Sequence, residues 1–205
     1  MCSKVLLTGG NGDLARFLQS AFSNERDVVS LSKNQLDVRS RTSLRKVFRK
    51  HHFDTVIHTA GTINPGHLTE IDPESWTKDL DVNIVGTFHL CQLALNANPK
   101  CRLILLSSTA AFNAYSDWTS YCISKYAQVN MAWALIEEGF DVVCLCPGAI
   151  DTKFRNTLNK PNPNLMTLAV ASVPILEASL SSLIEPGVYA YRKNAPLKKM
   201  EKYKY

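Results

Sequence analysis

A tyrosine and a lysine near the middle of the chain have the spacing needed for proton transfer. Tyr121 and Lys125 occupy positions i and i+4, and Ser108 precedes the tyrosine by 13 residues. Residues four apart share one face of a helix, so the ammonium can lie beside the phenol. A free phenol titrates near ~10, and a neighbouring cation lowers that pKa. The spacing therefore predicts that Lys125 lowers the pKa of Tyr121 and makes it a general acid/base.

A second tyrosine and lysine have the same spacing but not the same surroundings. Tyr189 and Lys193 also stand four residues apart. They lie in a segment typical of a strand, and Leu176 occupies the position of the serine. The first pair is therefore the candidate for chemistry.

The amino-terminal segment has the pattern of a dinucleotide-binding turn. The apolar run Val5–Leu7 reads as a buried strand, and residues 8–13 follow it with the sequence Thr-Gly-Gly-Asn-Gly-Asp. Leu14, Phe17 and Leu18 then recur at helical spacing. Glycines let a backbone turn tightly next to a pyrophosphate, and a helix N-terminus attracts its charge. An ordinary glycine turn is the alternative.

Apolar runs and helical patterns alternate along the whole chain. Strands are expected at 4–8, 27–31, 54–58, 102–107, 141–145 and 187–191, and helices near 12–23, 41–51, 74–97, 119–138 and 165–183. This alternation predicts an α/β fold, a Rossmann-type doubly wound parallel sheet with helices on both faces, and a ligand at the carboxyl ends of the strands. We expect one domain over residues 1–205, with a small lid region at 153–185 and a basic tail at 196–205.

Composition narrows the class of protein. The chain has 205 residues, a net charge of +5 and six scattered cysteines, without a Cys-x-x-Cys pair. We expect a reduced, cytoplasmic protein with no metal site, no signal peptide and no membrane span. The charge is modest and no base-reading motif accompanies it, so no nucleic-acid partner is expected.

Several short motifs follow one another in a specific order. They are Thr8 to Gly12, Leu36-Asp37-Val38, His58-Thr-Ala-Gly61, Asn83-Ile-Val-Gly86, Leu106-Ser-Ser108, Tyr121-x-x-x-Lys125 and Pro147-Gly-Ala-Ile-Asp-Thr152. In this order they resemble the short-chain dehydrogenase/reductase family, over roughly residues 4–155.

The resemblance implies a catalytic quartet. Tyr121 would exchange a proton with the substrate oxygen while hydride moves between a carbonyl or alcohol carbon and the nicotinamide. Lys125 would hold the ribose hydroxyls, Ser108 would polarise the carbonyl, and Asn83 would hold a water in the proton relay. Three alternatives stay open: Ser107 in place of Ser108, a backbone-satisfying Asn83, and Tyr121 as a core residue.

The resemblance also implies a set of cofactor contacts. They comprise Thr8, Gly9, Asn11, Gly12, Asp13, Leu14, Asp37, Val38, Ala60, Gly61, Asn83, Tyr121, Lys125, Pro147, Gly148, Ile150 and Thr152. After the second expected strand, Ser32 and Lys33 stand where an acid would select NAD. These two residues favour NADP(H), with NAD(H) as the alternative.

Other features leave the substrate class open. The glycine turn ends in Ala15, and His58 and Thr59 replace the two asparagines usual in the family. Nucleotide-sugar epimerase or dehydratase chemistry is therefore one alternative, and a non-catalytic NADP(H) sensor is another. Only 53 residues (205 − 152) follow Thr152, which argues against the larger substrate domain of the epimerases.

The two longest expected helices carry apolar residues on more than one face. Such helices predict a homodimer that pairs through them. The residues concerned are Phe88, Leu90, Leu93, Ala94, Leu95, Val129, Met131, Ala132, Trp133, Leu135 and Ile136.

Overall fold

Strands and helices alternate along the chain, as the sequence predicts. The computed structural model describes residues 3–22, 26–158, 161–180 and 183–202. The strands are β1 (Ser3–Thr8), β2 (Arg26–Leu31), β3 (Thr55–His58), β4 (Arg102–Leu106), β5 (Val142–Pro147), β6 (Gly187–Tyr191) and β7 (Lys198–Lys199). The helices are α1 (Asp13–Ala21), α2 (Arg41–Lys50), α3 (Pro73–Leu80), α4 (Gly86–Ala97), α5 (Thr119–Glu137), α6 (Lys153–Asn156) and α7 (Leu168–Ser179).

The strands form one seven-stranded sheet in the order β2-β1-β3-β4-β5-β6-β7. All neighbouring strands are parallel except β6 and β7. The predicted doubly wound α/β fold in a single domain is thereby confirmed. The chain leaves β1 toward β2 and returns to β3 on the other side of β1, which creates a switch point between β1 and β3.

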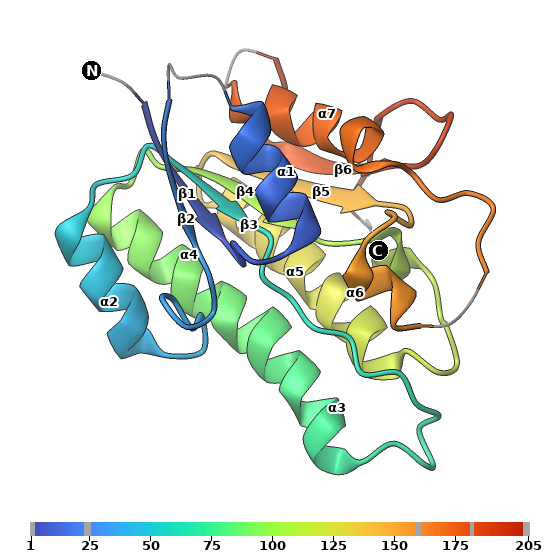
Figure 1. Cartoon of the computed structure of the whole chain (residues 1–205). Helices are drawn as coiled ribbons and strands as arrows, with labels where there is room; N and C mark the ends of the chain where they lie inside the picture. The colour runs from blue at the N-terminus through green and yellow to red at the C-terminus, as the bar shows by residue number, and fades with distance from the viewer. Residues whose placement is uncertain (1–2, 23–25, 159–160, 181–182, 203–205) are drawn as a thin grey trace.

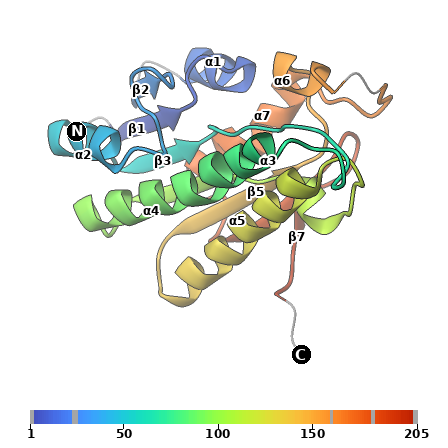
Figure 2. The ribbon, with the colours of Figure 1, turned by 90° about the horizontal axis from the view of Figure 1, so that it is seen from below.

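Helices cover both faces of the sheet, and each face has its own core (Figures 1 and 2). Helices α1 and α7 pack on one face, where Leu18 and Ile175 join the sheet residues Leu7 and Leu145. Helices α2, α4 and α5 pack on the other, where Leu44 is fully buried in the core. Burial on both faces explains why the strands read as continuous apolar runs.

The parallel strands end at a common edge. Register pairs Thr8 of β1 with Leu31 of β2 on one side and with His58 of β3 on the other. The loops that follow these strands therefore converge at this edge, where the fold places a ligand.

Two helices differ in extent from those that the sequence predicts. The helix expected over 74–97 is α3 and α4 joined by a π-helical turn at Asp81–Val85, so the chain runs on without a break in direction. The helix expected over 165–183 is shorter, because α7 spans Leu168–Ser179 and residues 181–182 lie outside the described residues. Residue 23 of the first expected helix and residues 203–205 of the basic tail also lie outside them.

The basic tail contributes a short strand that the sequence did not predict. Lys198 and Lys199 of β7 pair antiparallel with Ala190 and Tyr189 of β6. Their side chains remain exposed to solvent. Backbone pairing thus fixes part of a segment whose charge alone indicated a solvated terminus.

The residues expected at a dimer surface are mostly core residues. Leu90, Val129 and Ala132 are fully buried within the subunit. Only Phe88 of that set is classed among the exposed large apolar side chains, at 44 % exposure. Both helices pack against the sheet through a broad apolar face, which is why they contain more apolar residues than a helix with one narrow apolar face. The apolar pattern of the sequence therefore did not identify which residues of these two helices lie at the surface.

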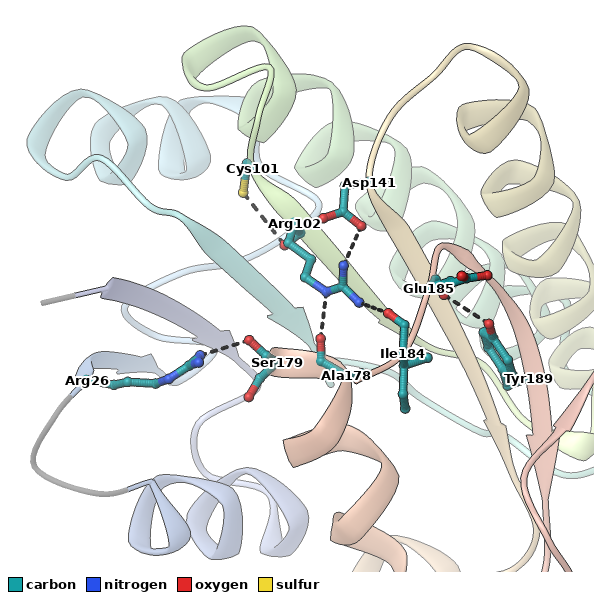
Figure 3. Close-up of polar contacts among 9 residues, drawn as sticks. All are labelled: Arg26, Cys101, Arg102, Asp141, Ala178, Ser179, Ile184, Glu185 and Tyr189. Atoms are coloured by element: carbon teal, nitrogen blue, oxygen red, sulfur yellow. Dashed lines mark hydrogen bonds and ion pairs between the residues drawn. The ribbon is translucent and has the colours of Figure 1, made fainter. Parts of the chain in front are cut away.

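A buried arginine fastens α7 to the amino ends of the strands, at the edge opposite the switch point (Figure 3). Arg102 opens β4, and its Nε donates to the Ala178 carbonyl oxygen at 2.6 Å. Its two terminal nitrogens donate to Asp141 Oδ1 and to the Ile184 carbonyl oxygen. Carbonyl groups at a helix C-terminus have no partner within the helix, so Arg102 supplies what α7 lacks.

We expect Arg102→Met to lower the free energy of unfolding by about 3 kcal/mol, because it leaves Asp141 and two carbonyl groups without their buried partner. Urea denaturation measures this loss. The control is Lys4→Met, which removes the solvent-exposed pair with Asp27 at 2.9 Å and is expected to cost less than about 1 kcal/mol. Equal losses in the two variants would contradict the role assigned to Arg102.

Candidate active site

A cavity of about 600 Å³ opens at the carboxyl edge of the sheet. It extends from the glycine turn after β1, past the ends of β3, β4 and β5, to α6 and the residue after β6. Among the predicted site residues its walls include Gly9, Asn11, Gly12, Asp13, Leu14, Lys33, Ala60, Gly61, Ser108, Tyr121, Lys125, Pro147, Gly148, Ile150 and Thr152. Most of the residues selected from the sequence therefore converge on one space.

The glycine turn forms one end of this cavity. Gly9 has a φ of +70°, and a Cβ there would lie 3.0 Å from the backbone of Ala60. A Cβ on Gly10 would lie 2.7 Å from Ser30 Oγ. Helix α1 begins directly after Gly12, and no side chain caps it. The uncapped N–H groups of a helix N-terminus bind anions, so this end of the cavity suits a pyrophosphate.

Ser108, Tyr121 and Lys125 meet at the centre of the cavity wall. Ser108 follows β4 and forms a side-chain hydrogen bond with Tyr121. Lys125 lies one turn further along α5, with its Nζ 5.5 Å from the centroid of the Tyr121 ring. Ser107, the alternative serine, points elsewhere: its hydroxyl donates to the Lys125 carbonyl oxygen at 2.8 Å. The geometry thus places Ser108 next to the tyrosine.

The two titratable groups are shifted by burial. Desolvation raises the pKa of Tyr121 above its ordinary value, and the bond with Ser108 only partly opposes that shift. Desolvation also lowers the pKa of Lys125 to about 8. The expectation that Lys125 lowers the pKa of Tyr121 is not met in this structure. Lys125 Nζ donates instead to the Leu106 carbonyl oxygen at 2.9 Å and to Gln128 Oε1 at 3.0 Å.

Asn83 lies behind the cavity wall and is fully buried in the π-helical turn. Its Nδ2 donates to the Thr62 carbonyl oxygen at 2.8 Å and to Ser124 Oγ at 3.0 Å. Its Oδ1 accepts from the Thr62 N–H at 2.9 Å. The side chain therefore ties the segment after β3 to α5, so that Gly61 and Tyr121 keep their relative positions.

Besides Asn83, four of the predicted cofactor residues do not line the cavity. Thr8 is buried, and its hydroxyl lies 2.8 Å from His58 Nδ1. Ser32 donates to Gln35 Oε1 at 2.8 Å. Asp37 binds Arg39, whose guanidinium lowers the pKa of that carboxyl. Val38 is packed so closely against α4 that a Cβ on Gly86 would lie 2.7 Å from its Cγ2.

Several cavity residues were not selected from the sequence. Ile63, Tyr115, Trp118 and Phe154 give the cavity an apolar part, and Phe154 of α6 lies with its ring centroid 6.3 Å from that of Tyr121. Arg192 follows β6 directly, at the edge where the fold predicts a ligand, so its position was a usable signal. Tyr115 and Trp118 lie on the loop before α5 and Phe154 lies on the one-turn helix α6, where neither periodicity nor motif indicated them.

Cationic side chains outnumber acidic ones around the cavity. Lys33, Lys125, Arg155 and Arg192 contribute positive charge, and Asp13 and Asp117 contribute negative charge. Asp13 Oδ2 accepts from the Lys153 N–H at 2.6 Å, which holds the start of α6 next to α1. The balance favours an anionic ligand.

Other classes of site find no support in the part of the chain that the structure describes. Within it, no group of three or more histidine, cysteine or acidic side chains could hold a metal ion. Its five cysteines form no disulfide. Over the same residues, no helix is both long and apolar enough to cross a membrane.

Comparison with known proteins extends this picture. The family model described as short chain dehydrogenase matches residues 3–163. An uncharacterized oxidoreductase of Schizosaccharomyces pombe is 29 % identical over 143 residues, which cover 65 % of this chain and 55 % of that protein. Dehydrogenase/reductase SDR family member 4 of Oryctolagus cuniculus is 30 % identical over 112 residues, which cover 50 % and 43 %. The chain thus aligns with about half the length of these two relatives.

A solved structure shares the fold over nearly the whole chain. The crystal structure of a small-chain dehydrogenase in complex with NADPH superimposes with a TM-score of 0.83 at 16 % identity, and covers 93 % of this chain and 97 % of that one. The strand order of the sheet and the glycine turn after β1 agree with the family match over residues 3–163. The chain belongs to the short-chain dehydrogenase/reductase family.

Proposed function

We propose that the protein is an NADP(H)-dependent oxidoreductase that interconverts a carbonyl and an alcohol, with Tyr121 as the general acid/base. The observation that carries this proposal is the meeting of Ser108, Tyr121 and Lys125 in one wall of a cavity whose far end is an uncapped helix N-terminus. A nicotinamide cofactor would supply or accept the hydride. The family membership and the NADPH in the related solved structure agree with this assignment.

The chain's own residues can perform the proton transfer. In the direction of reduction, Ser108 Oγ donates to the substrate oxygen, and the Tyr121 hydroxyl gives that oxygen its proton. The raised pKa of Tyr121 keeps the hydroxyl protonated before this step. The Lys125 ammonium lies one helical turn further along α5, with its Nζ 5.5 Å from the centroid of the reacting ring. Ile63, Tyr115 and Trp118 provide the apolar walls against which a small carbonyl substrate would pack.

We expect Tyr121→Phe to lower kcat for carbonyl reduction by about 10²- to 10⁴-fold, because it removes the transferable proton and leaves the ring in place. NADPH oxidation is followed by absorbance with a panel of aldehydes and ketones, and NADPH binding is measured by calorimetry. Binding should be unchanged in the variant. If the native protein binds NADPH but turns over no carbonyl, the sensor alternative gains support. If it binds neither NADPH nor NADH, the proposed function is wrong.

The choice of NADP(H) over NAD(H) depends on Lys33. This residue lines the cavity just beyond β2, whereas the hydroxyl of Ser32 is engaged with Gln35. Asp37, the next acid along the chain, is neutralised by Arg39 at 2.7 Å. Lys33 is therefore the residue that we propose to bind a 2′-phosphate.

Replacing Lys33 by alanine is expected to weaken NADPH binding by about fivefold and to leave NADH binding nearly unchanged, because an exposed ion pair contributes about 1 kcal/mol. Calorimetry with both nucleotides measures the ratio. Lys50→Ala, at the end of α2 and outside the cavity, is the matched control. An equal loss for both nucleotides would contradict recognition of the phosphate by Lys33.

We also propose a homodimer that pairs through α4, α5 and the π-helical turn. These elements lie side by side on one face (Figure 2) and expose large apolar side chains. Val85, Phe88, Ile123 and Tyr126 are 41 %, 44 %, 50 % and 39 % exposed. Exposed apolar side chains on neighbouring helices are typical of an interface, and a twofold axis through these helices would bury both copies of each residue.

We expect Phe88→Glu to raise the dimer dissociation constant by about 100-fold, because it places a charge in an apolar contact. Sedimentation equilibrium measures the change. Leu68→Glu, at an apolar side chain that is 67 % exposed in the loop before α3, is the matched control and should leave the association unchanged. A monomeric native protein, or a dimer insensitive to Phe88→Glu, would show that this surface is not the interface.

A further inference from the structure

A chain of buried hydrogen bonds runs from Lys125 to the start of the glycine turn. Lys125 Nζ donates to Gln128 Oε1 at 3.0 Å, and Gln128 Nε2 donates to Thr87 Oγ1 at 2.9 Å. His58 Nε2 lies 2.9 Å from the same hydroxyl, and His58 Nδ1 lies 2.8 Å from Thr8 Oγ1. All five side chains are buried. Residues of α4, α5, β1 and β3 are thus linked behind the cavity wall.

The orientation of the Gln128 amide follows from its neighbours. An ammonium can only donate, so the amide oxygen must face Lys125. At the other end of the amide, Nε2 lies 2.9 Å from the Asn83 carbonyl oxygen, which can only accept. The reverse orientation would face donor to donor and acceptor to acceptor. Gln128 is therefore matched to both groups in one orientation only.

The protonation of His58 follows in the same way. The Thr87 hydroxyl donates its proton to the Asn83 carbonyl oxygen at 2.7 Å, so toward His58 it can only accept. His58 must then carry its proton on Nε2 and accept from Thr8 at Nδ1. Burial lowers the pKa of His58 to about 3, which agrees with a neutral ring. Each donor in the chain thus has an acceptor.

The Asn83 carbonyl oxygen accepts two side-chain hydrogen bonds in this arrangement, one from Thr87 Oγ1 and one from Gln128 Nε2. The resemblance to the family implied a water held by Asn83 on the way to the lysine. In this chain the amide of Gln128 joins the Asn83 carbonyl to the Lys125 ammonium directly.

We propose that Gln128 is a positioning residue for Lys125, whose amide links the ammonium to the Asn83 carbonyl oxygen and fixes it beside Tyr121. Its importance for turnover rests on the proposed function, whereas the hydrogen bond to Lys125 is a property of the protein alone. Sequence spacing agrees, since Gln128 lies three residues after Lys125 on the same face of α5.

The charged and titratable groups around Lys125 show why Gln128 matters for the ammonium. Tyr121 precedes it on α5, Asp79 approaches from α3, and Cys144 and Cys146 approach from β5. His58 approaches from β3 and stays neutral. The carboxylate of Asp79 is engaged by the backbone and side chain of Asn64 and by Ser120, not by the ammonium.

The ammonium therefore has two direct acceptors within the described residues, and both are neutral. These acceptors are the Leu106 carbonyl oxygen and Gln128 Oε1. Gln128 is the one that a substitution can remove, because Leu106 contributes only its backbone.

The test is a direct titration of Lys125 by NMR in protein labelled on its lysine side chains, with the signal assigned by its absence in Lys125→Met. We expect the native midpoint near pH 8. Gln128→Leu removes an acceptor of the charged form, so the midpoint should fall by about one pH unit. Gln128→Glu supplies a carboxylate, so the midpoint should rise by about one unit.

Gln92→Leu is the matched control, because Gln92 accepts from Arg41 Nη1 at 2.8 Å on α4, away from the cavity. Its Lys125 midpoint should equal the native one. Unchanged midpoints in both Gln128 variants, each with a native-like spectrum, would overturn the proposal. Should Gln128→Leu fail to fold, the midpoint in Gln128→Glu decides alone.

Kinetics separate this proposal from the proposed function. In an active enzyme, Gln128→Leu should lower kcat about tenfold, change KM little and shift the pH profile of kcat in the direction of the NMR midpoint. If Lys125 responds but the native protein binds no NADPH, the positioning role stands and the proposed function fails. If carbonyl turnover is found but the Lys125 midpoint does not respond to the Gln128 variants, the proposed function stands and the positioning role fails.

Discussion

Burial of a charged lysine is the constraint on which the site depends. Lys125 is 4 % exposed, and an ammonium removed from water must find acceptors nearby. Strand β4 supplies one acceptor at its carboxyl end, and helix α5 supplies the other from its own next turn. Because these acceptors fix the ammonium, they also fix the distance from Lys125 to the ring of Tyr121. The placement of Lys125 relative to Tyr121 thus depends on the acceptors that the buried ammonium requires.

A buried cation lies at each end of strand β4. At its amino end Arg102 binds the carbonyl groups that end α7, and at its carboxyl end Leu106 binds Lys125. Helices α7 and α5, which lie on opposite faces of the sheet (Figure 1), are thereby both hydrogen-bonded to one central strand. Figure 3 shows the bonds of Arg102. Charged groups need specific partners, whereas apolar contacts tolerate small shifts. These two cations therefore help to determine where α5 and α7 lie on the sheet.

Histidine and threonine at 58 and 59 give the end of β3 a different set of partners from the asparagines usual in the family. His58 joins Thr8 to Thr87, and the Thr59 hydroxyl donates to the Thr8 carbonyl oxygen at 2.6 Å. The two bonds to Thr8 hold the end of β3 to the start of the glycine turn. The side chains of His58 and Thr59 are therefore both hydrogen-bonded at the end of β3.

The sequence by itself determined the order of strands and helices, the glycine turn and the Tyr121–Lys125 spacing, because each depends on residues that are near neighbours in the chain. Only the tertiary structure decided that Gln128 joins the Asn83 carbonyl to Lys125, that Asp37 is paired away from the cavity, and that burial shifts the pKa values of Tyr121 and Lys125. Desolvation depends on which elements pack together. Hydrogen-bond partners such as Gln128 and Asn83 come from separate helices, and no local pattern indicates that they meet.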